Sequence, residues 1–176
     1  MLPGLMDGAA TQTVLIREFR PEDQEACRRL YVEGLIGGKL AENDTGLDVD
    51  DIQMAYIDPP GNSFWVAQSG TEPGVGDVVG MIGVQQHDDG VGEIRRLRVD
   101  QAFRRRGIGS RLLETAVVFC RDRGYLKIAL DTFVEREPAI RLFEKFRFRH
   151  GRTREMQGKQ MLVFYYDLYG SDQTRA

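Results

Sequence analysis

The residues with the clearest chemical potential form an arginine-glycine turn, Arg104–Ser110, which follows a strand candidate and begins a helical pattern. Gly107 and Gly109 let a ligand approach the backbone closely because they carry no Cβ. The free N–H groups of a first helical turn point to the same place, where the helix dipole favours an anion. Three consecutive arginines add positive charge beside them. The turn therefore predicts a site for a diphosphate.

Two common phosphate-binding motifs are absent from this turn. The segment lacks the Gly-x-x-x-x-Gly-Lys-Ser/Thr pattern of a Walker loop. It also lacks the dinucleotide fingerprint, because Leu112 stands where the third glycine would be. A tight turn with solvated arginines is the structural alternative to a binding site.

The elements that must position the turn are predicted from hydrophobic spacing and turn residues. Strands are expected at residues 13–19, 64–68, 78–85, 91–99, 125–131, 148–153 and 161–168. Helices are expected from residue 20 and over 48–57, 107–123 and 138–146. This order predicts one α/β domain with a mixed sheet over residues 13–169, between a flexible leader, 1–12, and a tail, 170–176.

Two separated motifs resemble the GNAT superfamily of acyl-CoA-dependent N-acetyltransferases. Arg104–Gly109 fits the family's Arg/Gln-x-x-Gly-x-Gly/Ala motif, and Pro138–Phe148 is similar to its Ala-Ile-x-Leu-Tyr-x-Lys-x-Gly-Phe block. Shorter similarities are found at Arg20–Asp23, Leu97–Asp100 and Leu130–Thr132. The order of the elements agrees, so the resemblance covers roughly residues 13–169.

The resemblance implies a mostly antiparallel sheet flanked by helices, with acetyl-CoA held where two central strands splay apart. One strand ends at Val99 and the other lies near Leu130. The residues that would contact the cofactor are Leu97, Arg98, Val99, Arg104, Arg105, Arg106, Gly107, Ile108, Gly109 and Ser110. No metal is expected. Whether the acyl group is acetyl or longer is left open by the sequence.

The strand at residues 91–99 has no cleanly apolar face. With strict alternation, Glu93, Arg95, Leu97 and Val99 would share one face, and Ile94, Arg96 and Arg98 the other. A β-bulge near Leu97 would explain the broken pattern. It would also leave backbone groups free for the cofactor.

Transfer of an acetyl group to an amine requires that the ammonium lose a proton, and the leaving thiolate benefits from gaining one. The resemblance makes Glu93 the candidate base, acting through a water, provided that burial makes the carboxylate more basic; the alternative is an ordinary ion pair. The family's usual tyrosine acid is replaced by Phe143, so Tyr166 is the candidate substitute. Direct attack needs no cysteine, and Cys27 and Cys120 have the spacing of core residues.

The charge is divided unevenly along the chain. Residues 1–94 hold 5 Lys+Arg and 17 Asp+Glu, a net charge of −12, whereas the remaining residues carry +9. Acidic residues gather before the second strand at Glu42, Asp44, Asp48, Asp50, Asp51 and Asp58. These acids predict a wall that attracts a cationic amine, with a solvated acidic loop as the alternative. A small cationic amine or a protein amine is the expected acceptor.

Other classes of function are weighed against this one. A CoA-binding sensor of the same fold with little activity is the main alternative, because Phe143 carries no proton. A nucleic-acid partner is not expected, since the arginines are spread over different elements and the pI is about 5.5. No apolar run suits a membrane span, and two cysteines fit a cytoplasmic protein. The C-terminal strands could pair in a homodimer.

Overall fold

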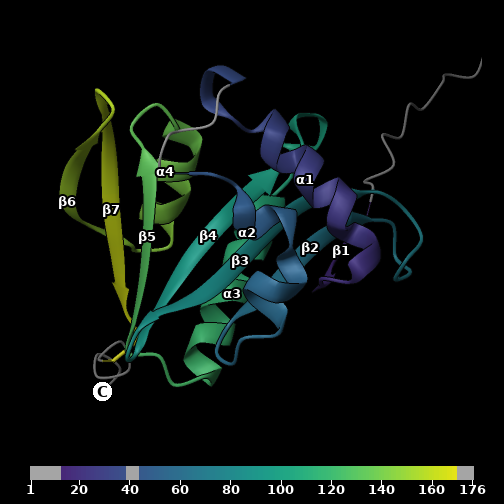
Figure 1. Ribbon diagram of the computed structural model, residues 1–176, viewed down its shortest axis with the longest axis horizontal. Helices are drawn as coiled ribbons and strands as arrows, with labels where there is room; N and C mark the ends of the chain where they lie inside the picture. Colours follow the sequence, from purple (N-terminus) through teal and green to yellow (C-terminus); the bar gives the residue numbers. More distant parts are fainter. Residues whose placement is uncertain (1–12, 39–43, 170–176) are drawn as a thin grey trace, which may run out of the picture.

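The computed structural model describes residues 13–38 and 44–169 of the chain. Within them, a seven-stranded sheet has the order β1-β2-β3-β4-β5-β7-β6 (Figure 1). The strands are β1 (Val14–Glu18), β2 (Ser63–Ser69), β3 (Val78–Asp88), β4 (Val91–Val99), β5 (Lys127–Phe133), β6 (Arg149–Met156) and β7 (Lys159–Asp167). The predicted leader, 1–12, and tail, 170–176, lie outside the described residues.

The main helices are α1 (Gln24–Glu33), α2 (Leu47–Asp50), α3 (Ile108–Asp122) and α4 (Glu137–Lys145). Short helical turns occupy Pro21–Asp23, Ile36–Gly38, Gln53–Ile57 and Gln101–Phe103. The predicted helix over 48–57 is divided, because Asp51 adopts φ −143° and ψ 83° and so breaks the helical backbone after α2. In α3, the predicted apolar spacing is confirmed, since Ile108, Leu112, Ala116 and Cys120 are buried.

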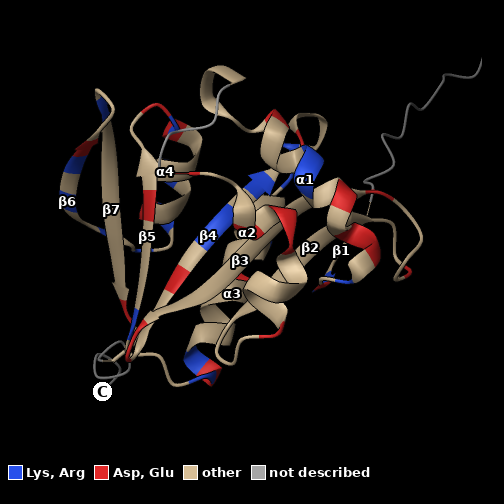
Figure 2. Cartoon of the chain, viewed as in Figure 1, with Lys and Arg blue, Asp and Glu red and all other residues tan. Residues whose placement is uncertain are grey.

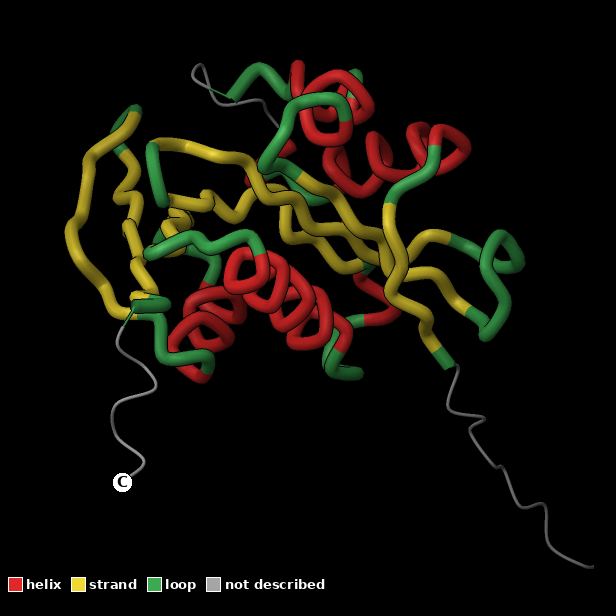
Figure 3. The backbone as a smooth tube through the Cα atoms, turned by 90° about the horizontal axis from the view of Figure 1, so that it is seen from below, coloured by secondary structure: helices red, strands yellow, loops and turns green. Residues whose placement is uncertain are grey.

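Helices cover both faces of the sheet (Figure 3). One core cluster joins α3 and α4 to the sheet, and its centre includes Leu112, Leu113 and Ile128. The other joins α1 and the Gln53–Ile57 turn to the opposite face, around Tyr56 and Phe64. None of the helices in the described part of the chain is long and apolar enough to span a membrane.

The sheet opens between β4 and β5. These strands form a parallel pair in which only three residues of each strand are in register, from Val91↔Lys127 to Glu93↔Ala129. Every other neighbouring pair is antiparallel. Beyond Glu93 the two strands diverge (Figure 1). The predicted mixed, mostly antiparallel sheet with a splayed central pair is thus confirmed.

A β-bulge interrupts β4 where the sequence analysis expected one. Arg95 is paired with Gly83 and Arg98 with Met81, so two residues of β4 lie opposite one residue of β3. Arg96 lies in the bulge and has a φ of 59°, in the left-handed region that non-glycine residues rarely adopt. The predicted bulge is confirmed.

The bulge changes which side chains share a face, so β4 does not follow strict alternation. Ile94, Leu97 and Val99 all pack in the core cluster on the α3 side. Arg96 instead lies against Tyr31 of α1, with its guanidinium 5.0 Å from the ring centroid. A register shift of one residue exchanges faces, and this one keeps the apolar residues together and leaves the arginines to the α1 side.

Candidate functional site

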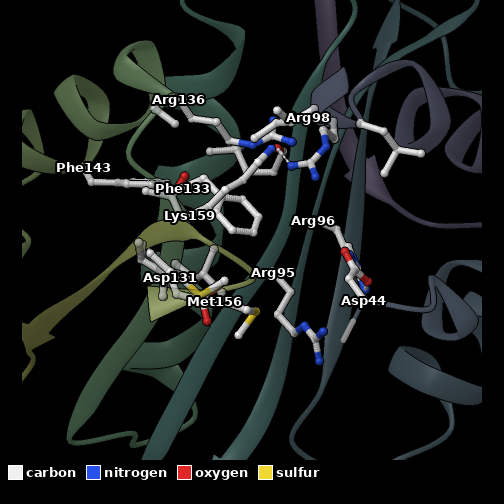
Figure 4. Close-up of a pocket in the computed structure, with 18 of the residues that line it drawn as sticks. Asp44, Arg95, Arg96, Arg98, Asp131, Phe133, Arg136, Phe143, Met156 and Lys159 are labelled. Atoms are coloured by element: carbon white, nitrogen blue, oxygen red, sulfur yellow. Dashed lines mark hydrogen bonds and ion pairs between the residues drawn. The ribbon is translucent and has the colours of Figure 1, made fainter. Parts of the chain in front are cut away.

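A cavity of about 650 Å³ lies where β4 and β5 diverge. It is lined by the outer half of β4, the end of β5, the loop after α1, the start of α4 and the β6–β7 turn. Figure 4 shows arginine side chains entering it from the β4 side and from the start of α4, with Asp131 and Met156 opposite Arg95. Basic residues also cluster on the diverging half of β4 in Figure 2. The lining is therefore predominantly cationic.

Arg96 forms ion pairs with two acids of the same chain. Its guanidinium donates two hydrogen bonds of 2.7 Å to Asp44, and its Nε donates one of 2.8 Å to Asp48. The Arg96 side chain is only 6% exposed. Burial alone would lower the pKa of Arg96, but the hydrogen bonds to these acids raise it. This arginine therefore holds the segment after α1 against the sheet.

The same contacts account for the acids that were expected to attract a cationic amine. Burial favours the neutral form of Asp44 and Asp48, yet the hydrogen bonds from Arg96 outweigh it and lower both pKa values. Asp50 forms an ion pair with Arg28 at 3.4 Å. Asp51 accepts a hydrogen bond from the backbone of Met54, and Asp58 accepts one from Gln53. Glu42 lies outside the described residues. Each of these five described acids thus has a hydrogen bond or an ion pair within the protein, and Arg28 and Arg96 supply the positive charge.

Two other guanidiniums in the cavity lack such partners. Arg98 donates a 2.9 Å hydrogen bond to the Leu97 carbonyl oxygen, and Arg136 donates one of 2.6 Å to the Gly34 carbonyl oxygen. No carboxylate of the described residues forms an ion pair with either of them. The Nε of Arg98 is buried and has no hydrogen-bond partner.

Asp131 extends from β5 on the opposite side of the cavity from Arg95 (Figure 4). It lines the cavity, and within residues 13–38 and 44–169 its carboxylate makes no hydrogen bond or ion pair. Its side chain is exposed to the cavity, yet desolvation by the neighbouring protein raises its pKa, and Arg95 and Arg154 partly oppose the shift. An unpaired carboxylate of raised pKa in a cavity is a candidate for proton transfer or for binding an ammonium group.

The arginine-glycine turn lies outside this cavity, at the start of α3. Gly107 precedes the helix with a φ of 76°, and no side chain caps the first turn. An added Cβ at Gly107 would meet no atom within 4 Å, so the approach is open. Arg104 donates a 3.1 Å hydrogen bond to the Val99 carbonyl oxygen, which ties the turn to the end of β4. An uncapped helix start beside arginines suits a pyrophosphate.

The structure places the predicted cofactor-binding residues in two groups. Leu97 and Arg98 line the cavity, and the residues from 104 to 110 surround the start of α3. Val99 links the groups, since an added Cβ at Gly109 would lie 3.8 Å from its side chain. An elongated ligand could follow this path from the turn to the cavity.

Neither predicted catalytic residue lines the cavity. Glu93 is the last residue of β4 paired with β5, and its carboxylate lies 3.2 Å from the Nδ1 of His87. Tyr166 packs in the helix-side core, with its ring 5.3 Å from that of Phe148. Their catalytic roles stay predictions. Phe143 does line the cavity. Cys27 and Cys120 are buried as expected, and burial raises the pKa of both thiols to about 12.

Three cavity residues were not singled out from the sequence. Asp131 is the last residue of the strand pattern predicted over 125–131. An acidic residue at the end of a buried strand indicates a candidate site, and this pattern could have identified it. Arg136 and Lys159 follow loops and carry no local signal. They reach the cavity only because α4 and β7 close its far side.

Comparison with protein families identifies the acetyltransferase (GNAT) family, whose model matches residues 20–148. A GNAT-family acetyltransferase from Staphylococcus aureus aligns with a TM-score of 0.75 at 19% identity, over 89% of this chain and 99% of that one. Arabidopsis thaliana NAA60 in complex with acetyl-CoA aligns with a TM-score of 0.70 at 18% identity, over 90% and 100% of the chains. At these identities the structures show the shared fold.

Curated relatives are more similar in sequence. N-acetylaspartate synthetase of Homo sapiens is 37% identical over 147 residues, which cover 81% of this chain and 45% of that protein. N-acetyltransferase 8 of Homo sapiens is 36% identical over 107 residues, which cover 58% of this chain and 45% of that protein. The chain thus spans less than half the length of either relative.

Proposed function

Since this chain belongs to the acetyltransferase (GNAT) family, we propose that it transfers an acetyl group from acetyl-CoA to a primary amine. One observation carries the proposal: β4, which borders the opening, leads through the Gln101–Phe103 turn to the uncapped start of α3. The opening gives access to strand backbone, and the helix start gives a place for phosphates. The family resemblance assigns the same two places to the cofactor.

The residues present fit acetyl-CoA along this path. The backbone of Leu97 and Val99 would bind the pantetheine arm, because the edge of β4 that faces β5 has no paired strand there. The backbone amides of Ile108, Gly109 and Ser110 would hold the pyrophosphate, with Arg104, Arg105 and Arg106 adding charge. Arg106 stacks over Phe103 at 5.1 Å, which fixes its place beside the turn.

Acetyl-CoA supplies an activated thioester, and the protein has to position the amine and remove its proton. The amine nitrogen attacks the carbonyl carbon, a C–N bond forms, and the C–S bond breaks with its electron pair going to sulfur. The nitrogen releases its protons to a base and finally to solvent. Phe143 cannot protonate the leaving thiolate, so that proton would come from water or from Tyr166. Both cysteines keep their protons at neutral pH, which supports direct attack without an acyl-enzyme.

The names of the relatives broaden the choice of acceptor. One of them is named for the synthesis of N-acetylaspartate, a product of amine acetylation on an amino acid. Amino acids therefore belong in any acceptor panel, beside polyamines and peptide amines.

The test follows release of free thiol from acetyl-CoA in the presence of such a panel. Turnover above the rate of hydrolysis supports the proposal. Tight CoA binding without turnover on any amine would contradict it and favour the sensor. Gly107→Val checks the cofactor path, because a β-branched residue at a φ of 76° strains the turn. We expect its affinity for CoA to fall at least tenfold, while Gly124→Val, at the far end of α3 and with a φ of 77°, should leave CoA affinity within about twofold.

A further inference from the structure

Two half-buried cations lie close together in the cavity, and neither forms an ion pair with an acid of the described residues. Arg98 lies on β4, and Arg136 directly precedes α4. Figure 4 shows their side chains reaching toward each other from opposite sides of the cavity. Burying one unpaired charge is costly, and a second like charge beside it adds repulsion. The fold nevertheless brings these two together.

The end of α1 brings both guanidiniums to this place. The carbonyl oxygen of Gly34 accepts the hydrogen bond from Arg136. An added Cβ at Gly34 would lie 2.6 Å from the Nε of Arg98, so only glycine leaves room for this side chain. The carbonyl end of a helix favours cations, but by a partial charge only. It positions the guanidiniums without neutralising them.

The pKa values of Arg98 and Arg136 agree with positive charges that no acid balances. Burial, with repulsion from Arg136 and Arg96, lowers the pKa of Arg98 to about 10. Burial, with repulsion from Arg104, lowers the pKa of Arg136 as well. Arg96 shows the opposite direction because it is paired with two acids. An anion that bound between Arg98 and Arg136 would remove this penalty.

The free Nε of Arg98 indicates the kind of anion. It is a buried donor with no partner, and it lines the same cavity as the unpaired carboxylate of Asp131. A guanidinium binds a carboxylate through parallel N–H groups. An acceptor amine that also carries a carboxylate could place that carboxylate on the two guanidiniums.

We infer that Arg98 and Arg136 bind a carboxylate of the acceptor, and that the acceptor is therefore an amino acid. This inference rests on the proposed function, because it specifies the second substrate of that reaction. It replaces the cationic amine expected from the acidic segment, whose acids are engaged elsewhere in the protein. Asp131 lines the same cavity and is the candidate acceptor of the ammonium proton.

The test compares amino acids with their neutral amides. Alanine, phenylalanine and aspartate would each be assayed beside the corresponding α-amide, with acetyl-CoA saturating. For the best pair, we expect kcat/KM to be at least tenfold higher for the acid. Arg98→Met and Arg136→Met should each lower the ratio of kcat/KM for the acid to kcat/KM for the amide at least tenfold, mainly through KM for the acid. Gly34→Ala, which displaces Arg98 without removing its charge, should act in the same direction.

The control is Arg141→Met on α4, whose side chain is 76% exposed and pairs with Glu137. It should leave both substrates unaffected. A wild-type protein that uses the amides as well as the acids would overturn the inference while leaving the proposed function intact. The inference would also be overturned if Arg98→Met and Arg136→Met lost affinity for CoA and kept their preference for acids. The two arginines would then bind a phosphate of CoA.

A binding measurement separates the two failures when no turnover is seen. With CoA bound, an amino acid should raise the melting temperature of the wild-type protein, and its amide should not. Loss of turnover with this shift retained would refute only the proposed function. Absence of the shift for all three amino acids, together with turnover on simple amines, would refute only the carboxylate site.

Discussion

Arg96 and Arg98 stand two residues apart on β4 and differ in almost every physical respect. Arg96 donates hydrogen bonds to Asp44 and Asp48, and its pKa is raised. Arg98 has a backbone carbonyl as its partner, an unpaired Nε and a lowered pKa. The first arrangement stabilises the fold, whereas the second keeps charge available for a ligand. The number of arginines in a cavity therefore says less about its ligand than the partners that each arginine already has.

The largest effect should come from removing the paired arginine. Arg96→Met leaves two buried or half-buried carboxylates without their cation, which costs about 3–5 kcal/mol for comparable buried pairs. Urea denaturation measures the free energy of unfolding directly. Arg141→Met, at an exposed ion pair, should change it by no more than about 1 kcal/mol. A loss below about 1 kcal/mol for Arg96→Met would show that Arg96 does not hold the acidic segment.

Asp131→Asn should have the next largest effect, on activity rather than stability. An amide cannot accept the ammonium proton, and loss of a positioned base lowers rates by about 100-fold or more. We expect this loss in kcat/KM with a melting temperature close to that of the wild type. Asp122→Asn, an exposed position on α3, serves as the matched control. Retention of full activity in Asp131→Asn would return the role of base to Glu93.

The pH dependence of activity should show the raised pKa of Asp131. The carboxylate must be ionised to accept a proton, so kcat/KM should fall as the pH drops through a pKa above its ordinary value of 3.8. In Asp131→Asn this acidic limb should disappear from the remaining activity. If the limb stayed in place in that variant, another group would be responsible for it.

Acid should destabilise the protein by protonating the two carboxylates that are paired with Arg96. Asp44 and Asp48 have lowered pKa values, so their contribution is complete above their ordinary pKa of 3.8 and is lost as the pH falls through the lower folded values. Unfolding followed below pH 5 should show this loss in the wild type. Arg96→Met should lack most of it, and Arg98→Met should retain it.

The smallest effect should be that of Arg98→Met on stability. Replacing a half-buried charge that has no acidic partner by an apolar side chain removes a desolvation penalty, while the Leu97 carbonyl oxygen loses a hydrogen bond. We expect the two to offset each other to within about 1 kcal/mol, in the same urea denaturation. A loss as large as that of Arg96→Met would mean that Arg98 is a structural residue.

The sequence predicted the parts of the molecule that depend on local order. The strand and helix pattern, the bulge near Leu97 and the buried Cys27 and Cys120 all follow from spacing within one segment. The helix expected over 48–57 is divided because Asp51 leaves the helical backbone. In the candidate site, the sequence located the arginine-glycine turn and the strand end beside it.

The remaining features depend on contacts between distant segments. Arg96 meets Asp44 and Asp48 across 52 and 48 residues of sequence, so acids that looked like a substrate wall are ion-pair partners. Arg136 reaches Gly34 across 102 residues. The bulge also exchanges the faces of β4, which decides that Arg98 lies toward α1. No local pattern carries this information.

The most direct measurement is a competition between one amino acid and its amide. The protein would receive acetyl-CoA with equal concentrations of phenylalanine and phenylalaninamide, and mass spectrometry would give the ratio of the two acetylated products, which equals the ratio of their kcat/KM values. The account predicts an excess of acetylated acid of at least tenfold in the wild type, and a ratio near one in Arg98→Met. A wild-type ratio at or below one would contradict it.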